Sequence, residues 1–440
     1  MNKIKNKNQH IAYELMVIFI FLNSLGFPGN YMLVFGDFLG TIVDYSCFFM
    51  EILMILFSSS DNILDLKLIE IKKKYVGIYF FLIFVVVDSM LMTVSVKDEV
   101  ITLIRLVVTA LFALWLCDFF TVDQILEMFC LAHSIFIIAT IIFTIFYPGL
   151  TIREYSSGID YIGLFDAKNN CATEISLGLS MTILYYQNCK RNHRHFLKFY
   201  YPVIMLQLLI LIRCKSVGAW IVVAIPIIYI LIIQKKVRIL ERIPIGWAFV
   251  VGSVSFLMVA ITIIPVFSWF FELVGKDATL TGRVPLWQHA LKVMSQNQPL
   301  TGYGYGMFWR NEKAVSMIQQ GFRRDSFMGN LTTGSHNLLI EIWMSIGLIG
   351  LALFFFMILY CFRKCREMEE TAYLFCCTFF LVFTIKGMTE RLLSTAYTYD
   401  VLLLFLTLAL GCSKRTNIKP PWKRLHCQEY SGEEKKREER

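Results

Sequence analysis

The sequence has few charged residues. Only 17% of its 440 residues are Asp, Glu, Lys or Arg, whereas 57% are hydrophobic and the mean hydropathy is +0.60. Because a soluble domain carries about 25% charged residues, this composition excludes an ordinary globular protein. Apolar runs recur along the chain, and each can cross a bilayer core of about 30 Å as a helix. The sequence therefore predicts an all-α polytopic membrane protein.

The sequence also lacks the patterns of several other protein classes. It has no internal repeat of the kind that many transporters show, and no glycine-rich pattern for binding a nucleotide. Its twelve cysteines have no CxxC-type spacing, and none lies between Gly275 and Ser335. We therefore expect no metal site, no cofactor and no disulfide framework, and we interpret the cysteines as small hydrophobic residues.

Twelve apolar segments are predicted to span the membrane. They lie at about 11–27, 38–58, 75–96, 99–118, 124–147, 169–187, 197–213, 216–233, 244–274, 337–361, 371–387 and 397–412. The run at 244–274 is too long for one perpendicular span, so it either tilts or is broken at Pro265. The chain then divides into nine spans (1–274), a polar loop with short helices (275–335), three spans (336–412) and a charged tail (413–440). The composition of the tail predicts a disordered segment.

Basic residues give the predicted orientation. Most of those in short loops follow alternate spans, for example Lys72, Lys73 and Lys74, and the positive-inside rule places them in the cytoplasm. The turn at 118–123 is an exception, because it has no Lys or Arg. Both termini are then cytoplasmic and the 275–335 loop is outside. The net charge of +9 reflects this topology and contact with anionic membrane lipid, so we expect no nucleic-acid partner.

Several cations lie on the predicted outer side, against the positive-inside bias. Lys168 follows the fifth span, Arg213 and Lys215 lie in the turn between the seventh and eighth spans, and Arg283 opens the large loop. A lipid diphosphate fits such a cluster, because Arg supplies bidentate hydrogen bonds and Lys a point charge. The alternatives are interfacial charges that flank helices and, for Arg283, an ion pair within the loop.

His336 closes the loop at the start of the tenth span, where we expect Ser335 to cap the helix. A helix N-terminus disfavours imidazolium, so the ring would be neutral and able to accept a proton as a general base. A purely structural histidine is the alternative. Asn337 follows directly and Glu341 lies about one helical turn further on, and both are candidate contacts for a sugar or for the loop.

Within the loop, the segment from Val284 to Gln296 is predicted to form an amphipathic helix that includes Trp287. Gly302-Tyr303-Gly304-Tyr305-Gly306 follows it. These glycines fit close backbone packing, and the two tyrosines, like Trp287, fit either contacts to a sugar or ordinary interfacial anchors.

Four segments resemble the bacterial O-antigen ligase and O-antigen polymerase family. They are TGRVPLWQHALKVMSQNQPLTGYGYGMF (281–308), SHNLLIEIWMSIGLIGLALF (335–354), LFDAKNNCA (164–172) and the looser match RCKSVGAW (213–220). In the last, Cys214 and Val217 depart from the family pattern. Together the segments cover under a quarter of the chain.

The resemblance implies metal-independent, inverting glycosyl transfer from an undecaprenyl-diphosphate-linked donor to a glycan acceptor, on the extracytoplasmic face of the cytoplasmic (inner) membrane. Arg283 and Lys215 match positions that contact the diphosphate, and His336 matches the general base. A polymerase of O-antigen, capsule or exopolysaccharide repeat units is the first interpretation, and a ligase that moves finished glycan to lipid A core or another acceptor is the alternative. A transporter of lipid-linked oligosaccharide is the alternative from another class. Other polysaccharide-assembly proteins are candidate partners.

Overall fold

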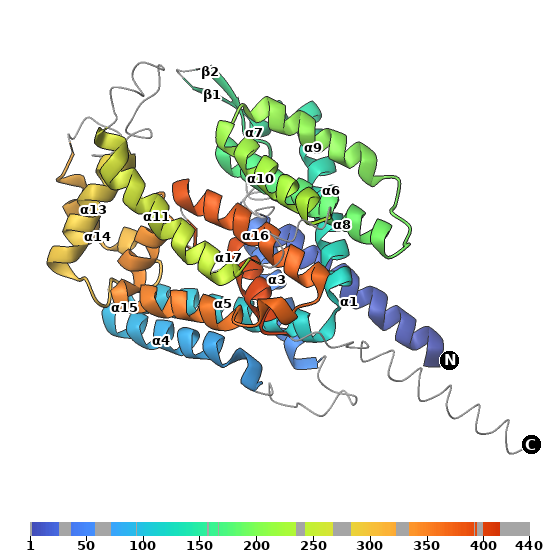
Figure 1. The fold of residues 1–440 in the computed structure, drawn as a ribbon, viewed down its shortest axis with the longest axis horizontal. Coiled ribbons are helices and arrows are strands. Elements are labelled where there is room, and N and C mark those ends of the chain that lie inside the picture. Colours follow the sequence, from blue (N-terminus) through green and yellow to red (C-terminus); the bar gives the residue numbers. More distant parts are fainter. Residues whose placement is uncertain are drawn as a thin grey trace, which may run out of the picture.

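A computed structural model describes residues 2–25, 37–57, 72–93, 95–155, 158–165, 167–234, 243–266, 283–322, 334–390, 392–393 and 399–413. Helices make up most of this part of the chain, and long helices pack side by side (Figure 1). The charged tail beyond Ser413, the loop cations between 235 and 242, and the loop segments 267–282 and 323–333 lie outside the described residues.

A helix lies at each of the twelve predicted spans. These helices are α1 (Asn2–Ser24), α3 (Asp37–Phe57), α4 (Val76–Met92), α5 (Val96–Phe119), α6 (Val122–Phe146), α8 (Lys168–Arg191), α9 (Tyr200–Cys214), α10 (Val217–Gln234), α11 (Ile245–Val266), α15 (Leu338–Cys361), α16 (Glu370–Thr389) and α17 (Tyr399–Cys412). Among the described residues, seven helices are long and apolar enough to cross a membrane. The helical membrane class is thus confirmed, whereas the count of twelve crossings stays a prediction.

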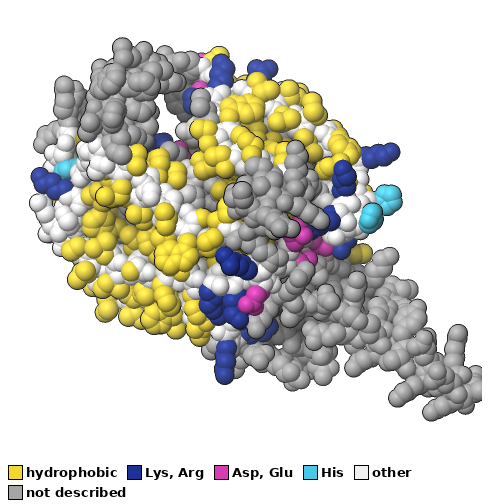
Figure 2. All heavy atoms as spheres, viewed as in Figure 1, with side chains coloured by type: hydrophobic (Ala, Val, Ile, Leu, Met, Phe, Trp, Pro, Cys, Tyr) yellow, Lys and Arg dark blue, Asp and Glu magenta, His cyan; other side chains and the backbone are white. Residues whose placement is uncertain are grey.

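The surface agrees with a membrane environment. Hydrophobic side chains cover much of the face in Figure 2, and most of the Lys and Arg side chains visible there lie towards its edges. Large residues such as Phe38, Leu91 and Phe146 are more than two-thirds exposed. Such residues would be costly in water, and lipid is the solvent that suits them.

The loop between α6 and α8 departs from the all-α expectation. After the short helix α7 (Pro148–Thr151), strands β1 (Ile152–Tyr155) and β2 (Gly158–Tyr161) form an antiparallel hairpin. The sequence IREYSSGIDY places strand-favouring residues on both sides of Ser-Ser-Gly, a pattern that favours a hairpin. The segment is too short to change the overall composition of the chain. The expectation of helices alone was therefore wrong at this hairpin.

The described residues of the large loop form two helices and a short 3-10 turn. The predicted amphipathic helix is confirmed as α13 (Arg283–Asn297), which is followed by η2 (Phe308–Arg310) and α14 (Glu312–Gln319). Trp287 of α13 is fully buried in a cluster with residues of α11, α14 and α15. In Figure 1 α13 and α14 lie together at one end of the molecule.

Helix α15 is broken near its middle. Ile346 and Gly347 have non-helical backbone angles, and the segment at 299–306 fills the break. Tyr303 and Gly304 donate backbone hydrogen bonds to Met344 (3.0 Å) and Ser345 (2.9 Å). Leu348 and Ile349 on the far side of the break donate to the carbonyls of residues 299 and 300. The loop thus satisfies backbone groups that have no water to bind at membrane depth.

Three ionisable residues form ion pairs that connect helices inside the bundle. Lys386 of α16 forms hydrogen-bonded ion pairs with Glu174 of α8 and with Asp400 of α17, at 2.9 Å for the latter pair. Lys386 and Glu174 are both buried. A buried charge is stable only when it is paired in this way, so the triad fixes the end of α16 against α8 and α17.

Candidate active site

Arg283 and His336 meet at one carboxylate. Nη2 of Arg283 lies 3.1 Å from Oε1 of Glu390, and Nδ1 of His336 lies 3.4 Å from Oε2 of the same side chain. Arg283 begins α13, His336 precedes α15 and Glu390 follows α16, so three separate segments converge. The side chains are 19%, 24% and 12% exposed, so all three are partly accessible.

Glu390 is held in its charged form. Burial raises the pKa of Glu390, but the hydrogen bond and charge of His336 and the charge of Arg283 outweigh burial, so the pKa lies below its ordinary value. The carboxylate is therefore ionised at neutral pH. An ionised carboxylate accepts hydrogen bonds only, so Nδ1 of His336 must be a protonated nitrogen in this contact. When the ring acts as a base, Nε2 is therefore the nitrogen that receives the proton.

His336 lies outside the helix that it was expected to begin. Helix α15 starts at Leu338, and its N-cap is Asn337, whose side chain accepts from the backbone of Leu339 (3.0 Å) and Ile340 (3.3 Å). The predicted cap at Ser335 was wrong, because Asn337 has the better position to reach these amides. His336 takes a left-handed conformation with φ 54°, which costs a non-glycine residue energy and turns its side chain towards α16.

Hydrogen bonds behind His336 fix the backbone that carries it. The indole of Trp287 donates to the carbonyl oxygen of Ser335 at 2.8 Å. The amide of Ser335 donates to the carboxylate of Glu341, which also accepts from the indole of Trp309 at 3.1 Å. Trp287 and Glu341 were expected to contact sugar or to lie near the base. In the structure both are buried and support the turn at His336.

The other candidate cations form a second group around the start of α8. Lys168 pairs with Asp160 of the hairpin at 2.9 Å. Lys215 lies in a left-handed turn directly after α9, and the adjacent Ser216 donates to Asn169 of α8 at 3.3 Å. Arg213 and Lys215 are both exposed. The turn therefore places exposed cations beside the first residues of α8.

No hydrogen bond or ion pair joins this second group to Arg283 or His336 among the described residues. The two groups are connected through α8 and α16, which pack together and share the Glu174–Lys386 ion pair. Glu174 lies less than two turns from Lys168, and Lys386 lies about one turn from Glu390. The start of α8 and the end of α16 therefore lie at the same end of the bundle.

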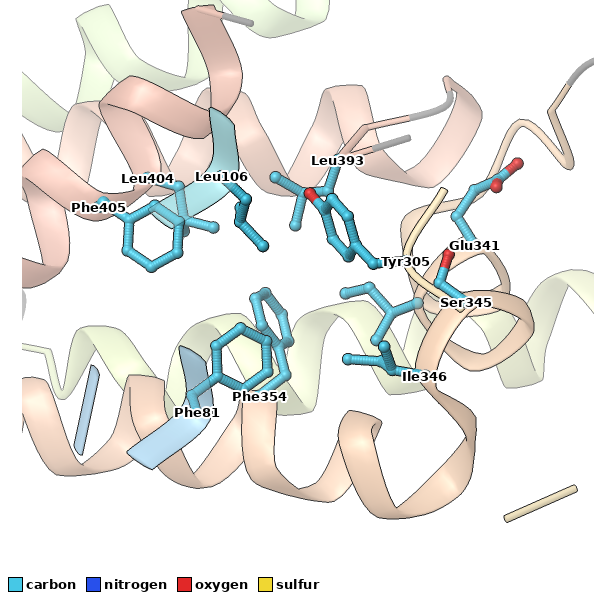
Figure 3. Close-up of a pocket in the computed structure, with 11 residues that line it drawn as sticks. Phe81, Leu106, Tyr305, Glu341, Ser345, Ile346, Phe354, Leu393, Leu404 and Phe405 are labelled. Carbon is cyan, nitrogen blue, oxygen red and sulfur yellow. The ribbon is translucent and has the colours of Figure 1, made fainter. Parts of the chain in front are cut away.

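Tyr303 and Tyr305 are buried in the packing of the glycine loop. The ring of Tyr303 packs edge-on against Phe308. Tyr305 enters a largely apolar pocket, where Glu341 and Ser345 lie on one side and Phe81 on the other (Figure 3). The close packing expected of the glycines is confirmed, since a Cβ at residue 302 would lie 2.7 Å from backbone of α15. A role in sugar contact stays a prediction, as it does for Asn337.

Glu390 is the residue that the sequence did not reveal. It lies 107 residues from Arg283 and 54 from His336, at the end of an apolar span where a charged flank is ordinary. The one available signal was its position four residues after Lys386. In a continuous helix that spacing would place both side chains on one face, but α16 ends at Thr389 and Glu390 is extended.

These observations define a helical membrane protein in which the polar loop brings an arginine and a histidine to one carboxylate, Glu390, that is only partly exposed. Residues 202–355, which include both of these residues, match the family model described as O-antigen ligase. This segment of the chain, about a third of its length, is therefore similar to the O-antigen ligase family. A search of curated proteins and a search of solved structures found no match. Glu390 and Lys168 lie outside the matched segment.

Proposed function

We propose that the protein is a membrane glycosyltransferase that polymerises undecaprenyl-diphosphate-linked oligosaccharide repeat units into a surface polysaccharide. The observation that carries the proposal is the Glu390 carboxylate between Arg283 and His336. Glycosyl transfer from a diphosphate needs a base for the incoming hydroxyl and a cation for the leaving group. The Glu390 carboxylate contacts a residue of each kind, with His336 as the base and Arg283 as the cation.

His336 is the proposed general base. An acceptor hydroxyl attacks the anomeric carbon of the donor sugar while its proton passes to Nε2 of His336. The bond between that carbon and the diphosphate oxygen breaks, and its electron pair leaves with the diphosphate. Attack from the side opposite the leaving group inverts the anomeric configuration. Glu390 keeps Nδ1 protonated and stabilises the imidazolium that forms. The aspartate of a Ser-His-Asp triad does the same for its histidine.

Arg283 is the proposed cation for the leaving diphosphate. Its guanidinium has five N–H donors, so it can keep its bond to Glu390 and still bind a phosphate oxygen. Arg283 and Glu390 together carry no net charge, however, so they do not attract an anionic donor from a distance. We assign that attraction to the exposed Arg213 and Lys215, with Lys168 as a further contact.

The predicted topology supports a lipid-linked donor. If both termini are cytoplasmic, the site faces the extracytoplasmic side of the cell membrane, where nucleotide sugars are absent. A polyprenyl diphosphate donor would keep its chain in the bilayer and present its sugar at the level of the polar loop. The protein's partners would then be this donor, a glycan acceptor and other polysaccharide-assembly proteins.

A ligase that transfers finished glycan to lipid A core or another acceptor uses the same chemistry and is the second candidate. The family model that matches residues 202–355 is described as O-antigen ligase, which favours this candidate. A flippase for the same lipid is a weaker candidate, because it would not need a base at His336.

The three candidates give different products from one defined donor. Purified protein in detergent or vesicles is incubated with an undecaprenyl-diphosphate repeat unit, alone or with lipid A core. A ladder of lengthened glycans from the donor alone supports the polymerase. Transfer that occurs only when lipid A core is added supports the ligase. Movement of the donor across the vesicle membrane without any lengthening would contradict both transferase assignments.

A further inference from the structure

Two cysteines touch at the end of the bundle that carries the candidate cations. Sγ of Cys171, in the first turn of α8, lies 3.7 Å from Sγ of Cys214, the last residue of α9. Both side chains are buried, at 0% and 1% exposure, in a cluster with Ile137, Tyr161 and Leu211. Two thiols at this separation need only side-chain rotation and a small backbone shift to reach bonding distance.

The predicted topology places this pair on the oxidising side of the membrane. Cys171 follows Lys168 by three residues, and Cys214 lies between Arg213 and Lys215. A second pair lies at the opposite end of the bundle, where Cys361 at the end of α15 neighbours Cys412 at the end of α17. The same topology places this pair in the reducing cytoplasm, where disulfides are rare.

We propose that Cys171 and Cys214 form a disulfide in the mature protein. The inference rests on the membrane topology that the proposed function assumes. It does not depend on the glycosyl-transfer reaction. The bridge would join the start of α8 to the turn after α9. It would thereby fix the left-handed turn at Lys215 and the neighbouring Ser216–Asn169 contact, so that the exposed cations keep one position relative to α8.

The oxidation requires a co-reactant, and a protein disulfide of the thiol-oxidase class supplies it. The thiolate of one cysteine attacks that disulfide, forms a mixed disulfide and releases one thiolate of the oxidase. The thiolate of the other cysteine then attacks the mixed disulfide and releases the second. Two thiols and one disulfide become one disulfide and two thiols, with both electrons passing to the oxidase. Because both sulfurs are buried in the folded bundle, the exchange must precede the packing of α8 against α9.

Thiol counting tests the bridge directly. Cells are quenched with acid, and free thiols of the full-length protein are labelled with a maleimide in SDS, with and without prior reduction. Of the twelve cysteines in the sequence, ten should react before reduction, which is twelve minus the bridged two, and all twelve after it. Digestion without reductant should release one cross-linked peptide pair that contains residues 171 and 214.

The inner pair provides the matched control. The Cys361→Ser/Cys412→Ser variant should still gain two reactive thiols on reduction, whereas the Cys171→Ser/Cys214→Ser variant should gain none. The latter should also unfold at a lower temperature than the oxidised wild type. Twelve reactive thiols before reduction would overturn the bridge.

A bridge at Cys361–Cys412 instead would overturn the proposal and show that the topology is reversed. None of these readouts measures glycosyl transfer. An active enzyme without the bridge therefore refutes only the bridge, and an inactive protein with it refutes only the proposed function.

Discussion

Glu390 lies 3.4 Å from His336, although 54 residues separate them, because one residue follows α16 and the other precedes α15. The same carboxylate binds Arg283, so any change at Glu390 should affect both the proposed base and the proposed diphosphate contact.

Replacing Glu390 by Gln keeps the shape of the side chain and removes its charge. The amide can no longer stabilise imidazolium and can present a donor to Nδ1, which favours the wrong tautomer. We expect kcat to fall about 10- to 100-fold, as is usual when a supporting partner is lost. Glu370→Gln, at the other end of the same helix and more than half exposed, is the control and should keep full activity. Equal rates for the two variants would remove Glu390 from the site.

Arg283→Lys should show whether the positive charge at residue 283 is enough or whether the planar guanidinium of arginine is needed. Lysine keeps the positive charge but cannot bridge a carboxylate and a phosphate with a planar fork. We expect Arg283→Ala to lower kcat about 100- to 1000-fold and Arg283→Lys to fall between it and the wild type. The measurement is steady-state transfer from a lipid diphosphate donor. Arg310→Ala, in the same loop and 56% exposed, should change little. If Arg283→Lys were fully active, bidentate contact would not be needed.

The depressed pKa of Glu390 predicts a specific dependence of stability on pH. A carboxyl group with a lowered pKa stabilises the folded state above its unfolded pKa of about 4.3, and this contribution is lost as the pH falls through the lower folded pKa. The part of the difference in thermal midpoint between wild type and Glu390→Gln that comes from this carboxyl group should therefore shrink as the pH falls below about 4. A difference that disappeared near pH 6 would mean that the pKa is raised.

Gly347→Ala should disrupt the break in α15. A Cβ at this position would lie 2.0 Å from the carbonyl oxygen of Leu300, and φ is 68°. The clash and the strain together should destabilise the protein by about 3 kcal/mol or more, measured as thermal unfolding in detergent. Gly252→Ala on α11, where a Cβ meets no atom within 4 Å, should leave the midpoint unchanged or slightly higher. A neutral Gly347→Ala variant would show that α15 is continuous.

The sequence predicted the helices well because hydrophobicity alone decides which segments can occupy a bilayer. It also predicted that Arg283 and His336 bracket one polar loop, since both positions are local to the loop. It did not predict Glu390, because nothing in a single sequence reports a contact between residues 54 or 107 positions apart.

The break in α15 was missed for a related reason. Ser-Ile-Gly-Leu-Ile-Gly is as apolar as the rest of the span, and only the docking of residues 299–306 makes a bend there stable. The β1–β2 hairpin was missed because four-residue strands carry a weak periodic signal.

The central claim is that His336 is the base of a glycosyl transfer, and a matched pair of histidine variants tests it most directly. His289 lies in α13 of the same loop and contacts the carbonyl oxygen of Met317 instead of a carboxylate. With a defined undecaprenyl-diphosphate repeat unit and its acceptor, His336→Ala should lose about 100- to 10,000-fold in single-turnover rate while still binding the donor. His289→Ala should transfer at close to the wild-type rate. Wild-type transfer by His336→Ala would contradict the account.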